Sequence, residues 1–318
     1  MSAREEKDEK KGVVVVTGVD LAPQAVEMLR DYELVFAGAK PTEDDLVKLS
    51  EQYKPVGIIV RYGAITGRIM DANKALRVIS KHGTGIDTID SKAAQERGIA
   101  VKAATGANAP AVAEHTWALI FACAKGVVHL DGRMREGHWD KSTHKSLELQ
   151  GRTLGLVGLG AIGRRVALTA VSLGMRVIAH DPFAKEAIAG VELVDLDKIF
   201  SDSDVLSLHC PLTAENKHMV NAQSLAKMKD GAILVNTARG GLIDEKALVE
   251  ALASGKLRCA GLDSFEQEPM VQNHPLQSIG NVILSPHVGG VSDNAYVAMG
   301  TGAAANLLAV VEAEEAAA

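Results

Sequence analysis

The sequence predicts an α/β protein built from two doubly wound parallel-sheet domains with a cleft between them. Its 318 residues exceed the size at which one hydrophobic core usually stops growing, which favours two domains. Short β-branched runs alternate with helical patterns almost throughout the chain, and such alternation is typical of βα units. The composition, 47% hydrophobic and 23% charged, supplies enough apolar material for two cores.

The predicted strands are short runs rich in Val and Ile, bounded by Gly, Asp, Asn or Pro. A stretch at 109–125 has apolar residues at helical spacing and Pro110 near its first turn, where a missing N–H costs nothing. We interpret this stretch as a long helix that joins the two lobes. The predicted strands span residues 13–17, 57–60, 78–79, 153–157, 177–179, 205–208, 233–235 and 282–284.

Composition also argues against several classes of partner. The formal net charge of -6 and the sequence pI near 5.9 disfavour a nucleic-acid binder. Cys123, Cys210 and Cys259 lie far apart without CxxC spacing, so we expect neither a metal site nor disulfides. Free cysteines fit a reducing compartment, so we expect a cytoplasmic location. The longest apolar stretch recognised, 116–124, falls short of the ~20 residues of a membrane span, so no membrane role is expected.

A glycine-rich turn follows the predicted strand 153–157. Gly158, Gly160 and Gly163 have the G-x-G-x-x-G spacing, and helical periodicity continues from 164 to 171. The first glycine permits the tight turn, the second lets the backbone approach a pyrophosphate, and the third allows close helix packing. The sequence therefore predicts a Rossmann-like dinucleotide site. Asp181, at the end of the next strand, suits the ribose 2'-hydroxyl of NAD and would repel the 2'-phosphate of NADP.

Three further side chains follow predicted strands. Arg239 comes after the strand 233–235, and its guanidinium could grip a carboxylate with two hydrogen bonds. Glu268 follows the run 260–265, which we also interpret as the end of a strand, and precedes Pro269. His287 follows the strand 282–284. A carboxylate beside a histidine fixes the imidazole tautomer and supports its use as a proton donor to a carbonyl.

These segments occur in an order that resembles the D-2-hydroxyacid dehydrogenase family. The similarity covers GLVGLGAIG at 155–163 and the segments 235–240, 262–269 and 285–289, and extends to the N-terminal third at 60–61, 83–87 and 111–116. It implies hydride transfer between NAD and a 2-hydroxy or 2-oxo acid. Arg239 would bind and polarise the substrate, His287 would exchange the proton, and Glu268 would sustain the basicity of the imidazole.

The resemblance also implies binding residues and an assembly. We expect a discontinuous substrate-binding domain at 1–106 and 291–318, an NAD-binding Rossmann domain at 107–290, and a homodimer with a loop arm at 137–147. The loop Gly83 to Gly85 would hold the substrate carboxylate through backbone N–H groups. The expected cofactor contacts outside the glycine turn and Asp181 are Thr84, Ala161, Ile162, Cys210, Pro211, Thr237, Ala238, Asp263 and Gly290.

The substrate is predicted from three cations. Within the family the chain is most similar to short D-3-phosphoglycerate dehydrogenases, because Arg61 and Lys81 match positions that handle the phosphorylated substrate, and Lys141 could add a third charge. Tyr62 and His82 depart from that pattern beside the expected substrate site, so hydroxypyruvate or glyoxylate reduction is the alternative. Ser264 is a further departure, standing where an aliphatic residue is usual.

Two readings from other classes stay open at this point. One is an NAD-sensing, corepressor-like binding protein, which an intact set of Arg239, Glu268 and His287 disfavours. The other is a related enzyme with formate or phosphite as the hydride donor. Glu268 stands where formate enzymes use an amide side chain, whereas the phosphite reaction needs the same three residues.

Overall fold

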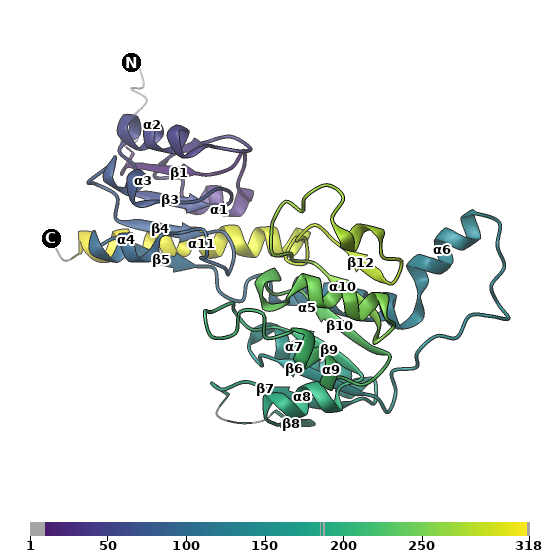
Figure 1. The fold of residues 1–318 in the computed structure, drawn as a ribbon. Helices are drawn as coiled ribbons and strands as arrows, with labels where there is room; N and C mark the ends of the chain where they lie inside the picture. The colour runs from purple at the N-terminus through teal and green to yellow at the C-terminus, as the bar shows by residue number, and fades with distance from the viewer. Residues whose placement is uncertain (1–9, 185, 187, 317–318) are drawn as a thin grey trace, which may run out of the picture. The chain divides into compact units, whose positions relative to one another are not determined.

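The computed structural model describes residues 10–184, 186 and 188–316. The chain divides into two compact units, Met1–Asn108 with Ser292–Ala318, and Ala109–Val291, which we call the N-terminal unit and the central unit (Figure 1). Among the described residues each unit holds one parallel sheet, of five strands in the N-terminal unit and seven in the central unit. The predicted fold class, two parallel-sheet α/β domains, is confirmed.

The sheet of the N-terminal unit has the order β2-β1-β3-β4-β5, so the direction of winding reverses between β1 and β3. One apolar cluster packs α1 and α11 against one face, and a second packs α2, α3 and α4 against the other. The elements are β1 (Val13–Val16), α1 (Pro23–Met28), β2 (Glu33–Phe36), α2 (Glu43–Tyr53), β3 (Gly57–Val60), α3 (Gly67–Asp71), β4 (Val78–Lys81), α4 (Ser91–Glu96), β5 (Ala100–Ala103) and α11 (Asp293–Glu315).

Helix α11 returns the end of the chain to the N-terminal unit. Its Ala303, Ala304 and Leu307 are fully buried, and a Cβ on Gly57 of β3 would lie 2.6 Å from a methyl carbon of Leu307. This close approach explains a glycine within a buried strand. By length and composition α11 could span a membrane over Asp293–Ala313, and it is longer than the apolar stretch 116–124 recognised in the sequence. A helix packed in a protein core passes the same test, and the buried side chains of α11 place it in such a core.

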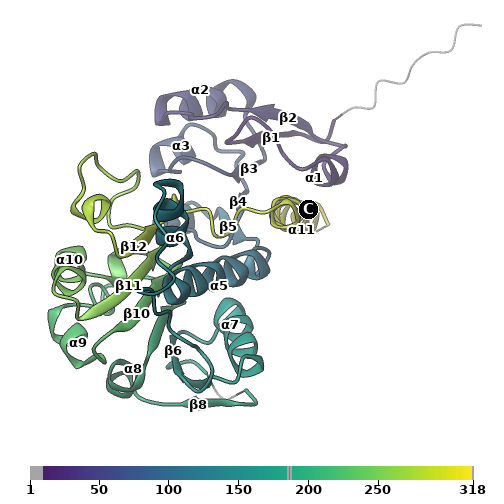
Figure 2. The same cartoon turned by 90° about the vertical axis from the view of Figure 1, so that its right-hand side faces the viewer.

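The sheet of the central unit has the order β12-β11-β10-β9-β6-β7-β8, and all neighbouring strands are parallel. Helices α5 and α7 cover one face, and α8, α9 and α10 cover the other (Figure 2). The elements are α5 (Ala109–Lys125), α6 (Val127–Arg135), β6 (Thr153–Val157), α7 (Ala161–Ser172), β7 (Arg176–His180), β8 (Val191–Leu193), α8 (Leu196–Asp202), β9 (Val205–Leu208), α9 (Ala222–Lys227), β10 (Ala232–Asn236), η1 (Gly240–Leu242), α10 (Glu245–Ala253), β11 (Leu257–Leu262), η2 (Pro275–Ser278) and β12 (Val282–Leu284).

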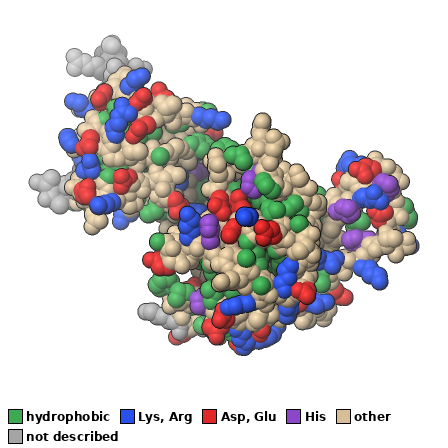
Figure 3. Space-filling model, viewed as in Figure 1, with side chains coloured by type: hydrophobic (Ala, Val, Ile, Leu, Met, Phe, Trp, Pro, Cys, Tyr) green, Lys and Arg blue, Asp and Glu red, His purple; other side chains and the backbone are tan. Residues whose placement is uncertain are grey.

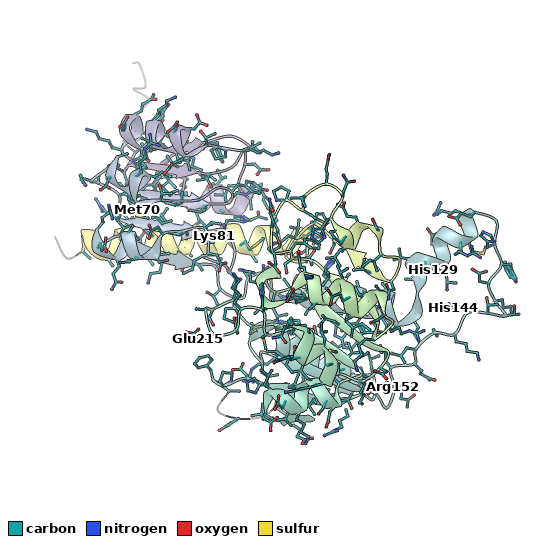
Figure 4. The ribbon with its side chains drawn as sticks, viewed as in Figure 1. Met70, Lys81, His129, His144, Arg152 and Glu215 are labelled. Atoms are coloured by element: carbon teal, nitrogen blue, oxygen red, sulfur yellow. The ribbon has the colours of Figure 1, made fainter. Side chains whose placement is uncertain are left out.

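One segment of the central unit, α6 and the loop 136–147, extends away from the sheet of that unit (Figures 1 and 4). We call it the arm. Within α6 no residue is buried, and Trp139 in the following loop is 74% exposed. Histidine side chains lie on it beside side chains of both charges, and one contact is the ion pair of Arg133 with Asp140 at 2.8 Å (Figure 3). The apolar side chains of the arm are therefore not covered by the rest of the central unit among the described residues.

Candidate active site

The three glycines of the turn meet three different demands. A Cβ on Gly158, which has φ 99°, would lie 2.6 Å from the carbonyl oxygen of His209, and a Cβ on Gly163 would lie 2.2 Å from the carbonyl oxygen of Gly158. Gly160 has open space around it, and α7 begins directly after it without a side-chain cap. The first-turn N–H groups of α7 are therefore available to an anion, as a dinucleotide pyrophosphate requires.

Asp181 follows β7 and lies beside the glycine turn. Its Oδ2 accepts the Leu159 N–H at 2.7 Å, and its Oδ1 accepts the Phe183 N–H at 2.9 Å. Each carboxylate oxygen can accept a second hydrogen bond, so these contacts orient the group and leave it able to bind a hydroxyl. The position fits the ribose of a dinucleotide bound at the glycine turn.

The other expected cofactor residues of the central unit follow β9, β10 and β12. Burial raises the pKa of the Cys210 thiol to about 11, so this side chain stays neutral, and the Asn216 amide donates to its sulfur. Thr237 is buried, and its hydroxyl lies within hydrogen-bonding distance, 2.9 Å, of that of Thr116 on α5. The residues that complete this set are Pro211 after β9, Ala238 after β10, Gly290 after β12, and Ala161 and Ile162 at the start of α7.

Arg239 and Glu268 belong to neighbouring segments at the carboxyl ends of β10 and β11. Arg239 donates from Nη1 to the Ala238 carbonyl oxygen at 2.8 Å, and its own carbonyl accepts the Asn236 amide at 2.9 Å. A Cβ on Gly240 would lie 1.9 Å from the backbone carbon of Phe265, so the two segments touch through their main chains. Such an approach is open only to glycine.

Glu268 and His287 form a direct pair. Nδ1 of His287 lies 2.7 Å from Oε2 of Glu268, and Oε1 of Glu268 accepts the Phe265 N–H at 2.9 Å. Because an ionised carboxylate only accepts hydrogen bonds, Nδ1 carries the hydrogen, and Nε2 is left for a substrate. The side chains are 46% exposed for His287 and 37% for Glu268, so solutes can reach them.

His287 has a left-handed backbone with φ 54°, a conformation that costs a residue with a side chain about 1–3 kcal/mol. The strained loop is held by Asp263, which is only 2% exposed. Its Oδ1 accepts the Val288 N–H at 2.9 Å, and its Oδ2 accepts the Gly289 N–H at 2.7 Å. The carboxylate of Asp263 therefore holds the loop that carries His287 through the backbone of the two residues that follow it.

Two residues whose roles sequence reasoning missed complete the contacts of Asp263. The hydroxyl of Ser285 donates to Oδ1 of Asp263 at 2.6 Å. Nε2 of His115, on α5, lies 2.9 Å from that hydroxyl and 3.3 Å from the carboxylate. The family resemblance includes the segment 111–116, but no local pattern there predicts which residues His115 contacts.

In the N-terminal unit the expected residues lie at the carboxyl ends of strands. Arg61 follows β3, and His82 follows Lys81, the last residue of β4 (Figure 4). Among the described residues, the backbone N–H groups of Gly83, Thr84 and Gly85 find no hydrogen-bond acceptor, whereas the Thr84 hydroxyl donates to Asn108 at 3.1 Å. Consecutive backbone N–H groups without an acceptor can together bind an anion such as a carboxylate.

Comparisons with known proteins identify the family of this chain. The family model for "D-isomer specific 2-hydroxyacid dehydrogenase, NAD binding domain" matches residues 117–289. A hydroxypyruvate reductase of Thermotoga maritima is 43% identical over 88% of this chain and 92% of its own length. A D-3-phosphoglycerate dehydrogenase of Methanocaldococcus jannaschii is 39% identical over 92% of this chain, which spans only 56% of that protein.

A solved structure of similar extent is the TT0316 protein of Thermus thermophilus. It has a TM-score of 0.88 and 39% sequence identity, and the match covers 95% of this chain and 97% of that one. The fold, the glycine turn and the family match point to the same conclusion. The chain belongs to the D-isomer specific 2-hydroxyacid dehydrogenase family and is an NAD-dependent oxidoreductase of 2-hydroxy acids.

Proposed function

We propose that the protein is an NADH-dependent hydroxypyruvate reductase that uses Arg239, Glu268 and His287. The observation that carries the proposal is the 2.7 Å contact between Nδ1 of His287 and Glu268 at a solvent-accessible edge of the central sheet. A carboxylate in that position stabilises the protonated imidazole, which is the form that can give a proton to a carbonyl oxygen. The name of the Thermotoga maritima relative supports this choice of substrate.

In this proposal each side chain has one task. His287 delivers a proton from Nε2 to the oxygen of the substrate carbonyl, while Glu268 holds Nδ1. Arg239 binds the substrate carboxylate and polarises the carbonyl. In the N-terminal unit, the N–H groups of Gly83 and Gly85 receive the carboxylate, and Arg61, Lys81 and His82 contact the rest of the substrate.

The same residues and the glycine turn define the cofactor site. The chemistry that NAD supplies when bound is the transfer of a hydride to or from the second carbon of the acid. We propose that the start of α7 holds the pyrophosphate and that Asp181 holds a ribose, while Asp263 acts by fixing the loop of His287. The remaining proposed contacts are Thr84, Ala161, Ile162, Cys210, Pro211, Thr237, Ala238 and Gly290.

A second candidate substrate is 3-phosphohydroxypyruvate, the oxidised partner of D-3-phosphoglycerate. Arg61 and Lys81 supply cations at the carboxyl edge of the N-terminal sheet, and the Methanocaldococcus jannaschii relative carries that activity in its name. Lys141 is on the arm of the central unit, where Trp139 is also exposed. It would serve this substrate only if the arm of a second copy brought it to the site.

We also propose a homodimer in which the arm packs against a second copy. The exposed apolar side chains of the arm, Val127, Val128, Met134 and Trp139, are each more than half exposed. Their burial in a partner would stabilise the assembly, because apolar surface favours removal from water. Light scattering on the wild type and on a Trp139→Glu variant would test this, with a dimer expected for the wild type and a shift toward monomer for the variant.

The proposed activity is tested by NADH oxidation with hydroxypyruvate, 3-phosphohydroxypyruvate, glyoxylate and pyruvate in separate reactions. We expect the highest kcat/KM with hydroxypyruvate. If none of the four acids oxidises NADH above the rate without enzyme, the proposed function is wrong. If 3-phosphohydroxypyruvate gives the highest kcat/KM, the second candidate replaces the first.

A further inference from the structure

The carboxyl edge of the N-terminal sheet has a switch point between β1 and β3, where the strand order reverses. In open α/β sheets with this strand order, ligands bind at that point. Arg61 follows β3 there, and the buried Thr17 follows β1. The Thr17 hydroxyl accepts the N–H groups of Arg61 at 3.0 Å and Tyr62 at 3.1 Å, and donates to the Tyr62 carbonyl at 2.7 Å. The backbone that carries Arg61 is thus fixed.

The guanidinium of Arg61 is held in place and its charge is balanced. It lies 5.3 Å from the ring centre of Tyr62 and 5.2 Å from that of Tyr296, and its side chain is 12% exposed. Its Nη1 donates to the carboxylate of Asp20 and, at 2.7 Å, to the main-chain carbonyl of the same residue. A cation paired in this way has lost much of its attraction for a second anion.

His82 adds a neutral polar group to the same cluster. Its ring centre lies 5.8 Å from that of Tyr296, and the residue is 9% exposed. Burial, with the nearby charge of Arg61, lowers the pKa of His82 to about 4, so the imidazole is neutral at physiological pH. Among the described residues, its buried Nε2 atom has no hydrogen-bond partner. A buried polar atom without a partner in the chain can be satisfied by a polar group of a bound molecule.

We propose that Asp20 is a specificity residue, which cancels the charge of Arg61 so that the N-terminal unit accepts a 2-oxo acid with a neutral hydroxymethyl group in preference to its phosphorylated counterpart. Nε2 of His82 hydrogen-bonds the hydroxyl of that group. This inference rests on the proposed function and adds a physical reason for the choice between its two candidate substrates. A phosphate at the switch point would have to displace Asp20 from Arg61 and would meet its negative charge.

The test compares kcat/KM for hydroxypyruvate and for 3-phosphohydroxypyruvate in the wild type and in Asp20→Asn. The wild type should prefer hydroxypyruvate, and Asp20→Asn should move the ratio of the two values toward the phosphorylated acid by at least about tenfold. Asp31→Asn is the matched control, because Asp31 is as exposed as Asp20 and pairs with Lys11 and Arg30 instead. An unchanged ratio in Asp20→Asn would overturn the inference.

A second variant tests the role of His82. His82→Phe keeps a ring beside Tyr296 and removes the nitrogen, so the preference for hydroxypyruvate over pyruvate should fall by about tenfold. A preference equal to that of the wild type would remove His82 from the proposal. Because all readouts are ratios between substrates, a general loss of activity does not imitate them. Absence of turnover with every acid contradicts the proposed function itself, whereas turnover with unchanged ratios contradicts only the inference.

Discussion

Nδ1 of His287 donates to Oε2 of Glu268 over 2.7 Å, and the backbone N–H of Phe265 fixes the other oxygen of the carboxylate. The imidazole is therefore oriented from one side, and its Nε2 is kept for the substrate. The strained backbone of His287 is tied down independently by Asp263 through the N–H groups of Val288 and Gly289. Orientation and anchoring thus come from two different carboxylates.

Glu268→Gln should reduce kcat for hydroxypyruvate by about tenfold to a hundredfold, because the neutral amide no longer stabilises the protonated imidazole. Binding of NADH, followed by its fluorescence, should be unchanged, since Glu268 is not among the residues proposed to hold the cofactor. Glu250→Gln, at an exposed position of α10, is the matched control and should keep the wild-type rate. A Glu268→Gln enzyme with full kcat would show that the carboxylate does not assist His287.

Asp181→Asn should weaken the preference for NADH over NADPH by at least about tenfold, because the variant removes the charge that repels a 2'-phosphate. The amide oxygen can still accept one of the two N–H groups that Asp181 binds, so the turn should persist. The measurement is kcat/KM for both cofactors, with Asp197→Asn, an exposed residue of α8, as the control. If the preference of Asp181→Asn equals that of the wild type, another group selects the cofactor.

Gly163→Ala should lower the free energy of unfolding by about 1–3 kcal/mol, because its Cβ would lie 2.2 Å from the Gly158 carbonyl oxygen. It should also weaken NADH binding. Gly280→Ala, outside the arm, is the control, since a Cβ there meets nothing within 4 Å and should leave stability nearly unchanged. Urea unfolding measures the free energy of unfolding of both variants. Equal values for the two variants would contradict the close-packed turn.

The pH dependence of stability should reveal two histidines, His209 and His82, each of which has an imidazole nitrogen shielded from solvent. Burial lowers the pKa of His209 to about 4, whereas the unfolded chain binds this proton near the ordinary value of 6.5. The free energy of unfolding should therefore fall as the pH drops from 6.5 to about 4, by up to about 3 kcal/mol for this residue. His82 should contribute in the same window. Below about pH 4 neither group changes stability further.

The check is urea unfolding at several pH values across that window. His209→Gln should reduce the slope of the free energy of unfolding against pH by the equivalent of about one bound proton. His129→Gln, at an exposed position of the arm, should leave that slope unchanged. A slope that is the same in the wild type and in His209→Gln would mean that His209 is not buried in its neutral form.

Much of the fold could be predicted because buried parallel strands leave a strong local pattern. The runs 57–60, 205–208 and 282–284 and the helix at 109–125 agree with β3, β9, β12 and α5 to the residue. Strands β2, β5 and β8 were not among the predicted strands, and β11 was indicated only by the run 260–265 before Glu268. Their sequences ELVF, AVKA, VEL and LRCAGL include charged residues, alanine or glycine, and pairing with a neighbouring strand, which a local pattern does not contain, makes them strands.

The residues of the candidate site could also be predicted in part, whereas some of the contacts between them could not. The order of Gly158, Arg239, Glu268 and His287 along the chain carried the family resemblance, and the structure brings Glu268 and His287 into contact. The pairing of Asp20 with Arg61 could not be predicted, because it joins two loops at the edge of a sheet and follows no spacing rule. Contacts between distant loops depend on the finished fold.

The central claim is that His287 gives the proton to the substrate carbonyl, and the most direct measurement is kcat for hydroxypyruvate reduction by His287→Ala. We predict a loss of about a hundredfold to ten-thousandfold relative to the wild type, with NADH binding retained. His138→Ala, on the arm, provides the control and should keep the wild-type rate. A His287→Ala enzyme that reduces hydroxypyruvate at the wild-type rate would contradict the account.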